Sequence, residues 1–129
     1  MTNKELNLKL INDFPDLYEV YMSETEWQEG DNTGSHTVYG DVLAPYFEDC
    51  VSKKNYSEVK KILDFLEEIL LCHDKYADEA VVFSVLEGME ETLINDRNLA
   101  CLVGKTTKSM LIQLSKYKRE AGYRWQNGQ

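Results

Sequence analysis

Hydrophobic residues along this chain recur mainly at helical spacing. The clearest case runs from about Ser57 to Cys72, where apolar residues follow one another at intervals of three and four positions: Val59, Ile62, Leu63, Leu66, Ile69 and Leu70. This spacing places them on one face of an α-helix. Asn55, followed three residues later by Glu58, predicts an N-terminal cap for that helix.

Weaker patterns of the same kind predict helices at about residues 4–12, 15–29, 38–51, 74–93 and 105–118, with a polar loop at 30–35. The segment 15–29 sets Leu17, Tyr18, Tyr21 and Met22 against an acidic face. The segment 74–93 has apolar positions on more than one stripe, which predicts a central helix packed on two sides. Pro45 lacks an amide hydrogen and is expected to kink or delay its helix. Thr106 or Thr107 is expected to cap the last helix.

The alternation of Val, Ile and Thr that is typical of strands is hard to find anywhere in the chain. We therefore predict an all-α fold, a single-domain bundle of about five to seven helices that covers residues 1–129. A length of 129 residues fits one domain. With 43% hydrophobic residues the chain has enough apolar material for a core, which argues against intrinsic disorder.

The longest uninterrupted apolar stretches have only about four residues, so we expect neither a secretory signal nor a transmembrane span. Three cysteines cannot all pair within one chain, and this usage is typical of a reduced, cytoplasmic protein. Cys50 and Cys72 continue apolar helical stripes and are expected to be buried structural thiols.

Charge is divided unevenly along the sequence. The chain has 23 acidic and 14 basic residues and a net charge of −9. Residues 10–52 contain ten acids and no Lys or Arg, whereas residues 97–129 contain seven basic residues and one acid. Such a negative field repels phosphates, so nucleic acids and anionic membranes are not expected partners. A solvated face that keeps the protein soluble is one interpretation, and a docking surface for a basic partner is the other.

The candidate contacts for a basic partner form two groups. The first consists of Glu24, Glu26, Trp27, Glu29 and Asp31, and the second of Asp41, Glu48 and Asp49. Trp27 is included because its large ring with a polar edge suits a protein interface. Asp41 has a competing structural role as a helix cap after Gly40.

No catalytic residue, metal ligand or cofactor is expected. Val103-Gly104-Lys105-Thr106 resembles the end of a phosphate-binding loop, but position 99 is Leu where the first glycine should stand. The cysteines and histidines lack the spacing of zinc ligands. Adjacent acids such as Glu67 and Glu68 point about 100° apart on a helix and form no acid–base pair.

The two histidines are not placed to activate a nucleophile. His36 is expected in the polar loop and His73 at a helix end, both as ordinary surface or cap residues.

Four short motifs follow one another within residues 11–93. They are Phe14-Pro15 with Leu17-Tyr18, Tyr39-Gly40-Asp41-Val42, Leu63-Asp64-Phe65-Leu66-Glu67-Glu68, and Ala80 to Phe83 with Leu86-Glu87. In this order they resemble small all-helical bacterial immunity proteins encoded with polymorphic or contact-dependent growth-inhibition toxins. Pro45 departs from the pattern, which implies an uninterrupted helix after Val42, and the basic C-terminal section lies outside the resemblance.

The resemblance implies a protein that binds the toxin domain of a delivered effector and blocks its active site or its assembly with a target. Together with the charge it predicts an immunity protein, or antitoxin, that neutralises a cognate toxin domain such as a basic nuclease. An acidic helical adaptor, which would show an exposed apolar groove, is one alternative. A DNA mimic that inhibits nucleic-acid enzymes is another, and a metal-dependent enzyme is the third.

Overall fold

The computed structural model describes residues 1–127, and the side chains of residues 1–121. Its described residues form helices and no strand, which confirms the predicted all-α fold. The α-helices are α1 (Asn3–Asp13), α2 (Tyr18–Thr25), α3 (Ser35–Val38), α4 (Ala44–Ser52), α5 (Tyr56–Leu70), α6 (Lys75–Val81), α7 (Glu90–Asn95), α8 (Arg97–Ala100) and α9 (Lys105–Asn127). They outnumber the five to seven expected, because several predicted helices are interrupted.

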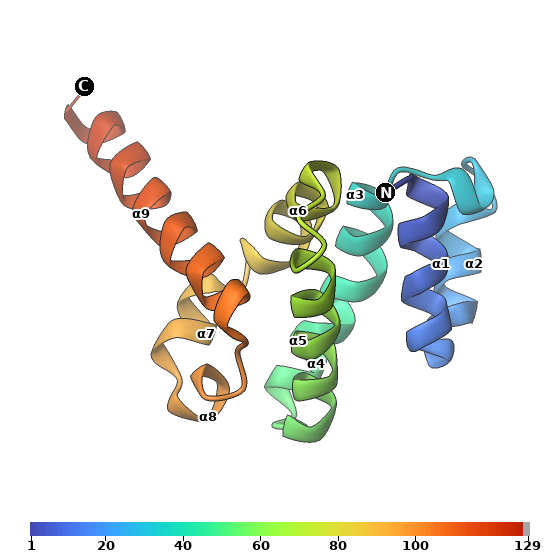
Figure 1. The fold of residues 1–129 in the computed structure, drawn as a ribbon, viewed down its shortest axis with the longest axis horizontal. Helices are drawn as coiled ribbons and strands as arrows, with labels where there is room; N and C mark the ends of the chain where they lie inside the picture. Colours follow the sequence, from blue (N-terminus) through green and yellow to red (C-terminus); the bar gives the residue numbers. More distant parts are fainter. Residues whose placement is uncertain (128–129) are drawn as a thin grey trace.

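The helices lie in a row with α5 in the middle (Figure 1). The pair α1 and α2 forms one end of the row, and α7, α8 and α9 form the other. The central helix α5 packs against α4, α6 and α9. Its predicted apolar face is buried, and the side chain of Asn55 accepts a hydrogen bond from the Glu58 amide at 3.3 Å, which confirms the predicted cap.

One contiguous core connects the row. It contains buried side chains from α1 to α9, among them Leu6, Tyr21, Phe47, Ile62, Leu86 and Leu111. The ring of Phe65 contacts Phe14 edge-on, with centroids 5.2 Å apart, and stacks on Tyr39 at 6.3 Å. Burying a large apolar side chain contributes about 1.5–3 kcal/mol, so this core is the main source of stability.

The prediction of a single helix at residues 74–93 is wrong. After α6 the chain forms a π-helical turn, η4 (Val82–Leu86), and α7 begins only at Glu90. Within η4 the Glu87 amide donates to the Val82 carbonyl five residues earlier, at 2.8 Å. The wider turn rotates the following residues to a new face. The two apolar stripes in the sequence therefore reflect a change of helical register rather than a straight helix packed on two sides.

A second π-helical turn, η3 (Tyr39–Leu43), precedes α4 and accounts for Pro45. The backbone is helical from Ser35 through η3 into α4, and the Ala44 amide donates to the Tyr39 carbonyl five residues earlier, so Pro45 follows directly on the wider turn. The helix is therefore not delayed at Pro45, and its irregularity is the π-helical turn before the proline. Asp41 lies inside η3, which has no side-chain cap, so the predicted capping role of Asp41 is wrong.

The helix predicted at 15–29 is shorter than expected. It consists of a 3-10 turn, η1 (Pro15–Leu17), and of α2, which ends at Thr25. Leu17 and Tyr21 are buried, whereas Tyr18 and Met22 are exposed, so only half of the predicted apolar face packs on the core.

Two predictions about single residues near helix ends are also wrong. Ser35 already begins α3, so His36 lies in a helix rather than in the polar loop, which itself contains a 3-10 turn, η2 (Gly30–Asn32). Cys50 is buried as predicted, but Cys72 is exposed, because α5 ends at Leu70 and no longer continues the stripe. His73 follows in the left-handed region, with φ of 54°.

Candidate functional site

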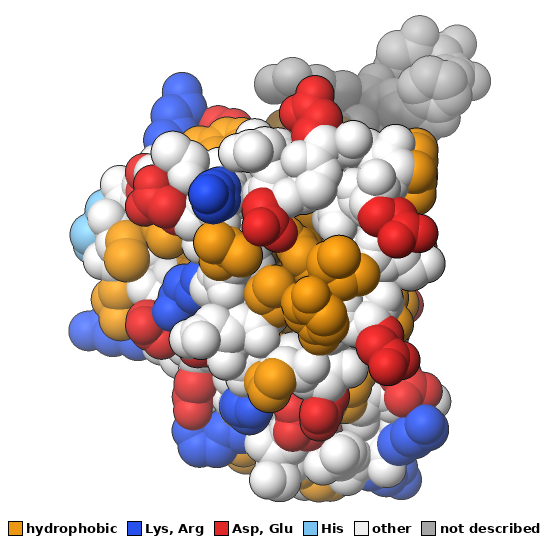
Figure 2. Space-filling view, turned by 90° about the vertical axis from the view of Figure 1, so that its right-hand side faces the viewer, with side chains coloured by type: hydrophobic (Ala, Val, Ile, Leu, Met, Phe, Trp, Pro, Cys, Tyr) orange, Lys and Arg blue, Asp and Glu red, His pale blue; other side chains and the backbone are white. Residues whose placement is uncertain are grey.

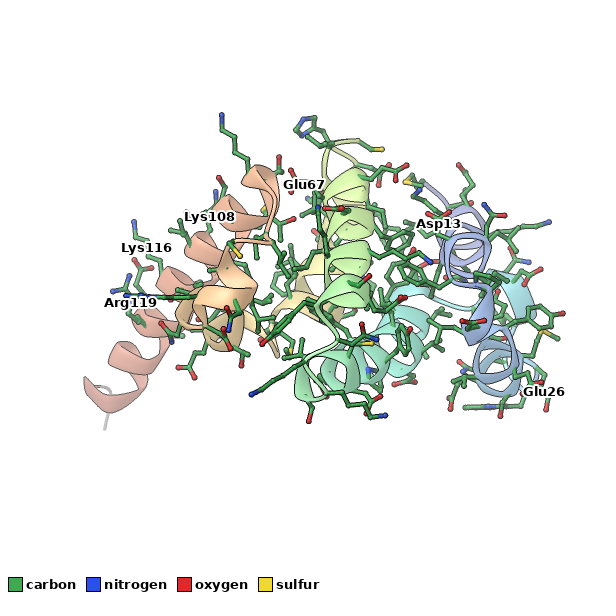
Figure 3. The ribbon with its side chains drawn as sticks, turned by 90° about the horizontal axis from the view of Figure 1, so that it is seen from below. Asp13, Glu26, Glu67, Lys108, Lys116 and Arg119 are labelled. Carbon is green, nitrogen blue, oxygen red and sulfur yellow. The ribbon has the colours of Figure 1, made fainter. Side chains whose placement is uncertain are left out.

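The acidic and basic side chains of the two segments are separated in space. Glu26 lies at the α2 end of the molecule, whereas Lys108, Lys116 and Arg119 extend from α9 at the opposite end (Figure 3). Arg124 of the basic section lies outside the described side chains. Of the ten acids in residues 10–52, the described structure pairs two with a cation, Asp13 with Lys9 and Asp49 with Lys53.

The first predicted group of contacts lies on one continuous segment. We call residues 24–34, which comprise the last two residues of α2 and the segment after it with η2, the acidic loop. Glu26 and Glu29 are exposed, Glu24 is half-buried, and Trp27 is 72% exposed. Gly30 has φ of 58°, a left-handed conformation that glycine adopts without strain. The structure therefore brings these residues together at one end of the molecule.

A buried asparagine on α1 holds the acidic loop in place. Asn7 is completely buried, and its Nδ2 donates to the carbonyls of Asp31 at 3.0 Å and Thr33 at 2.7 Å. Its Oδ1 accepts a hydrogen bond from the Ser35 hydroxyl at 2.9 Å. Because every polar atom of the amide has a partner, its burial fixes the loop rather than weakening the core.

Tyr21 makes the second attachment of the acidic loop. Its hydroxyl donates to Asp31 Oδ1 at 2.6 Å. Burial, and after it the hydrogen bond to Asp31, raises the pKa of the Tyr21 hydroxyl well above its usual value. Asp31 is thus an internal support of the loop, while Glu26, Trp27 and Glu29 face solvent.

The second predicted group does not join the first into one patch. Asp41, on η3, and Glu48 and Asp49, on α4, are all exposed. Asp49 Oδ2 lies 3.0 Å from Lys53 Nζ, which offsets its charge. A Cβ placed on Gly88 would lie 3.8 Å from Glu48 Oε1, so Glu48 faces the junction of η4 and α7.

Exposed apolar side chains accompany the acids at this end. Figure 2 looks onto the end formed by α1 and α2 and shows a cluster of hydrophobic side chains bordered by acidic ones. The large exposed hydrophobic residues of these two helices are Leu8, Tyr18, Val20 and Met22. An apolar centre with a charged rim is the usual anatomy of a protein interface. Tyr18 and Met22 belong to the apolar face predicted for their helix, and they form the part of it that does not pack on the core.

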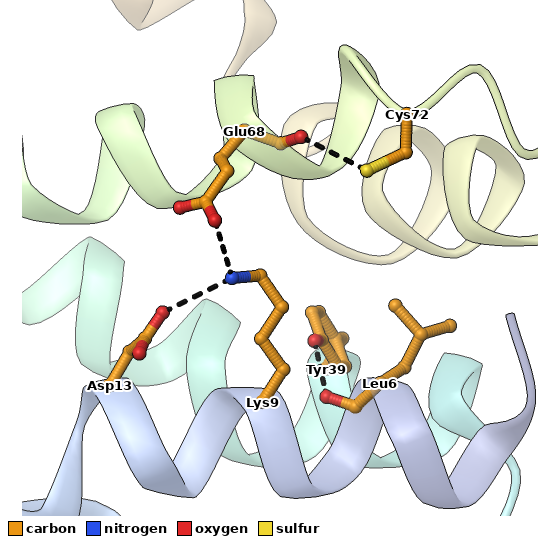
Figure 4. A network of polar contacts seen from close by, with 6 residues as sticks. All are labelled: Leu6, Lys9, Asp13, Tyr39, Glu68 and Cys72. Atoms are coloured by element: carbon orange, nitrogen blue, oxygen red, sulfur yellow. Dashed lines mark hydrogen bonds and ion pairs between the residues drawn. The ribbon is translucent and has the colours of Figure 1, made fainter.

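The end that carries this surface is tied to the centre of the molecule by the contacts in Figure 4. Lys9 Nζ lies 2.9 Å from Glu68 Oε1 on α5 and 3.4 Å from Asp13 Oδ2 on α1. The Tyr39 hydroxyl donates to the Leu6 carbonyl at 2.7 Å. The acidic loop is therefore presented by a supported part of the fold.

At the other end, α9 is capped by a side chain of α5 rather than by one of its own threonines. Glu67 on α5 accepts hydrogen bonds from the amides of Thr106 at 3.0 Å and Thr107 at 2.7 Å, and from the Thr107 hydroxyl at 2.7 Å. The predicted cap by Thr106 or Thr107 is therefore wrong. Partial burial works to raise the pKa of Glu67, but the hydrogen bonds from Thr107 and Thr106 outweigh it and hold this pKa below its usual value.

Gly104 makes this contact possible. A Cβ at position 104 would lie 2.5 Å from Glu67 Cδ, closer than any side chain allows. The Gly-Lys-Thr sequence that resembles a phosphate-binding loop thus serves to admit a carboxylate of the same chain.

Neither a metal centre nor a membrane segment is found in what the structure describes. No group of three or more His, Cys, Asp or Glu among the described residues is arranged to hold a metal ion. None of the described helices has the length and the apolar character needed to cross a membrane.

Comparison with known proteins identifies the family of the chain. The model of a family described as a domain of unknown function, DUF7674, matches residues 7–119. No curated protein and no solved structure matches the chain significantly.

Proposed function

The chain belongs to the DUF7674 family, a domain of unknown function, and we propose that it is an immunity protein, which binds and neutralises a cognate toxin domain. The toxin domain is a basic protein, such as a nuclease, and the acidic loop is the centre of the contact. The protein works as a stoichiometric inhibitor in the cytoplasm, without a catalytic step of its own.

The observation that carries this proposal is the exposed Trp27 between Glu26 and Glu29 on an anchored loop. A tryptophan that is 72% exposed leaves a large apolar ring in water, and burial against a partner would remove it. The flanking carboxylates have no cation within ion-pair distance among the described residues. They would attract a basic surface and orient it around the ring.

Preorganisation adds to this support. Asn7 and Tyr21 fix the loop before any partner arrives, so binding need not order it. An acidic surface can also occupy the positive cleft in which a nuclease holds phosphates.

The test begins with capture of partners from the native host at low salt, followed by a wash at high salt. The wild-type chain is compared with the triple variant Glu26→Lys, Trp27→Ala, Glu29→Lys. A control variant, Glu87→Lys with Glu91→Lys, makes the same change of net charge at exposed acids on the other side of the fold. We expect the wild type and the control to retain one basic protein and the triple variant to lose it.

The captured protein is then expressed alone and together with each variant while growth is measured. The proposal requires that it be toxic alone and that the wild type and the control, but not the triple variant, restore growth. Capture of several unrelated nucleic-acid enzymes would favour a DNA mimic instead. Equal protection by the triple variant would refute the acidic loop as the binding site.

The alternative of a helical adaptor is favoured by a different observation. Residues of α6, η4 and α9 line an open, mainly apolar groove of about 440 Å³. A groove of this kind is what an adaptor would offer, and retention of a large nontoxic assembly in the same capture experiment would support that function.

A further inference from the structure

The apolar part of the groove beside α9 is lined by residues of two structural elements. Val82 and Phe83 come from the π-helical turn η4, and Met110, Leu114 and Tyr117 come from one flank of α9. Phe83 is 54% exposed and Tyr117 is 65% exposed. Two large aromatic side chains are therefore exposed to solvent at the apolar groove, which is unusual on the surface of a small protein.

The π-helical turn explains why Phe83 is there. In a regular α-helix adjacent residues point about 100° apart, whereas a π-helical turn has more residues per turn and brings neighbours closer in direction. Val82 and Phe83 consequently both line the groove, although they are adjacent in sequence.

Acidic side chains mark one part of the groove. Asp78 and Glu79 of α6 belong to its lining, which includes no Lys or Arg. Asp78 Oδ1 is buried without a hydrogen-bond partner in the described structure. Burial raises the pKa of Asp78, an effect that His73 opposes. A cation placed at this part of the groove would stabilise the ionised carboxylate.

The chain itself carries a segment with the complementary chemistry. Residues 122–129 read Gly-Tyr-Arg-Trp-Gln-Asn-Gly-Gln and offer two aromatic residues around one arginine. Helix α9 continues unbroken to Asn127 and projects beyond the other helices (Figure 1). Since its middle part lines the groove, the end of the same straight helix points away from its own groove.

We propose that a second copy of this chain docks the end of its α9, with Tyr123, Arg124 and Trp125, in the groove between η4 and α9, and that the exchange is reciprocal in an antiparallel homodimer. The lengths agree. From Tyr117 to Trp125 a helix advances about 12 Å, and from Met110 to Tyr117, the part that lines the groove, about 10 Å. A two-fold axis near Tyr117 lets both grooves be filled at once, as an isologous interface requires.

The dimer leaves the acidic loop accessible, because the loop lies at the opposite end of the molecule from α9 (Figure 3). The inference therefore stands independently of the proposed function.

The test is the molar mass of the full chain by sedimentation equilibrium, from low to high micromolar concentration. The wild type is compared with Phe83→Glu in the groove and Arg124→Glu in the docking segment. The matched control is Ile112→Glu, which introduces the same charge at an apolar residue of α9 that is 56% exposed and does not line the groove. Circular dichroism of each variant verifies that it is folded.

We expect the wild type and Ile112→Glu to form dimers, and Phe83→Glu and Arg124→Glu to dissociate at least about tenfold more readily. A charge exchange sharpens the test, since Glu79→Arg should weaken the dimer and its combination with Arg124→Glu should restore it. Such rescue requires that the two positions meet across the interface.

Four results would overturn the inference. A monomer at every concentration excludes a second copy, and if Phe83→Glu also weakened capture of the partner described above, the groove would belong to that partner. A dimer that neither variant affects uses another surface. A dimer that responds to Phe83→Glu but not to Arg124→Glu is not built from the end of α9.

Discussion

The acidic loop is held to the body of the molecule chiefly by the neutral amide of Asn7, whereas α9 is held by carboxylates. On the loop side the central group is the amide of Asn7, which is fully buried and fully partnered. On the α9 side Glu67 caps the helix, and Lys118 reaches Glu90 Oε2 at 3.0 Å. The contacts of Asn7 and those of Glu67 and Glu90 hence differ in their response to pH, because a side-chain amide does not titrate in the acidic range and a carboxylate does.

The strongest effect is expected at Asn7. Asn7→Leu would leave the carbonyls of Thr33 and Asp31 without the Asn7 donor, the first of them in a buried bond, and would remove one acceptor of the Ser35 hydroxyl, which costs about 2–4 kcal/mol of the free energy of unfolding. Urea denaturation measures this loss. The control is Asn12→Leu, the same change at an exposed residue of α1, which should stay within about 0.5 kcal/mol of the wild type. Equal losses in both variants would contradict the anchoring role of Asn7.

Glu67→Gln is expected to cost about 1–2 kcal/mol near neutral pH, because it removes the charged cap of α9. The folded-state pKa of Glu67 is lowered, so its stabilisation is present above the unfolded pKa of about 4.3 and is lost as pH falls through the folded pKa. Denaturation of both chains across this range should show their difference vanishing on acidification.

Two controls test whether this pH dependence belongs to Glu67. Glu68→Gln changes the neighbouring acid, whose contact with Lys9 is largely exposed, and should cost less than about 1 kcal/mol. The loss from Asn7→Leu should not change over the same pH range. A pH-independent loss from Glu67→Gln would mean that its carboxylate does not act as a charged cap.

Gly104→Ala is expected to cost about 1 kcal/mol, because the new methyl group displaces the Glu67 carboxylate from the helix amides. The matched control is Gly34→Ala, where an added Cβ meets nothing within 4 Å. In a double-mutant cycle, Gly104→Ala should cost less when Glu67 is already Gln, since both changes remove one contact. Additive losses would disprove that shared contact.

The smallest effect on stability is expected for Trp27→Ala. Its ring packs little against the protein, so the free energy of unfolding should change by no more than about 0.5 kcal/mol. Urea denaturation followed by circular dichroism is the measurement. A loss above about 1 kcal/mol would show that Trp27 belongs to the core of its end rather than to a surface kept for a partner.

A helix is predicted best from the sequence when its apolar spacing and its N-terminal cap both lie within the same element. For α5 the apolar spacing and the pair Asn55 and Glu58 lie within the element, so its position is predicted to within a few residues. Cys72 was assigned to the core because it extends that spacing, but periodicity does not report where a helix ends. The π-helical turns were missed for a related reason, since their extra residue imitates a second apolar stripe.

The two attachments could not be predicted from local pattern, because each joins residues that are far apart in the chain. Glu67 meets Thr107 across 40 positions, and Asn7 meets Thr33 across 26. Asn7 did leave a signal, since it is a polar residue beside Leu6 on the face of α1 that Leu6 and Leu10 bury. The charge of the sequence predicted the acidic loop. That Asp31 is engaged within the fold, whereas Glu26 and Glu29 face solvent, followed only from the contacts of Tyr21 and Asn7.

The cap that Glu67 provides for α9 also bears on the order in which the chain folds. A contact across 40 residues closes a long loop, and the entropy of that closure delays contacts of this kind relative to those within α5. The first turn of α9 then forms against an α5 that is already in place. Substitutions at Gly104 or Glu67 should accordingly accelerate unfolding and leave the folding rate almost unchanged, as is usual for contacts that are absent from the transition state.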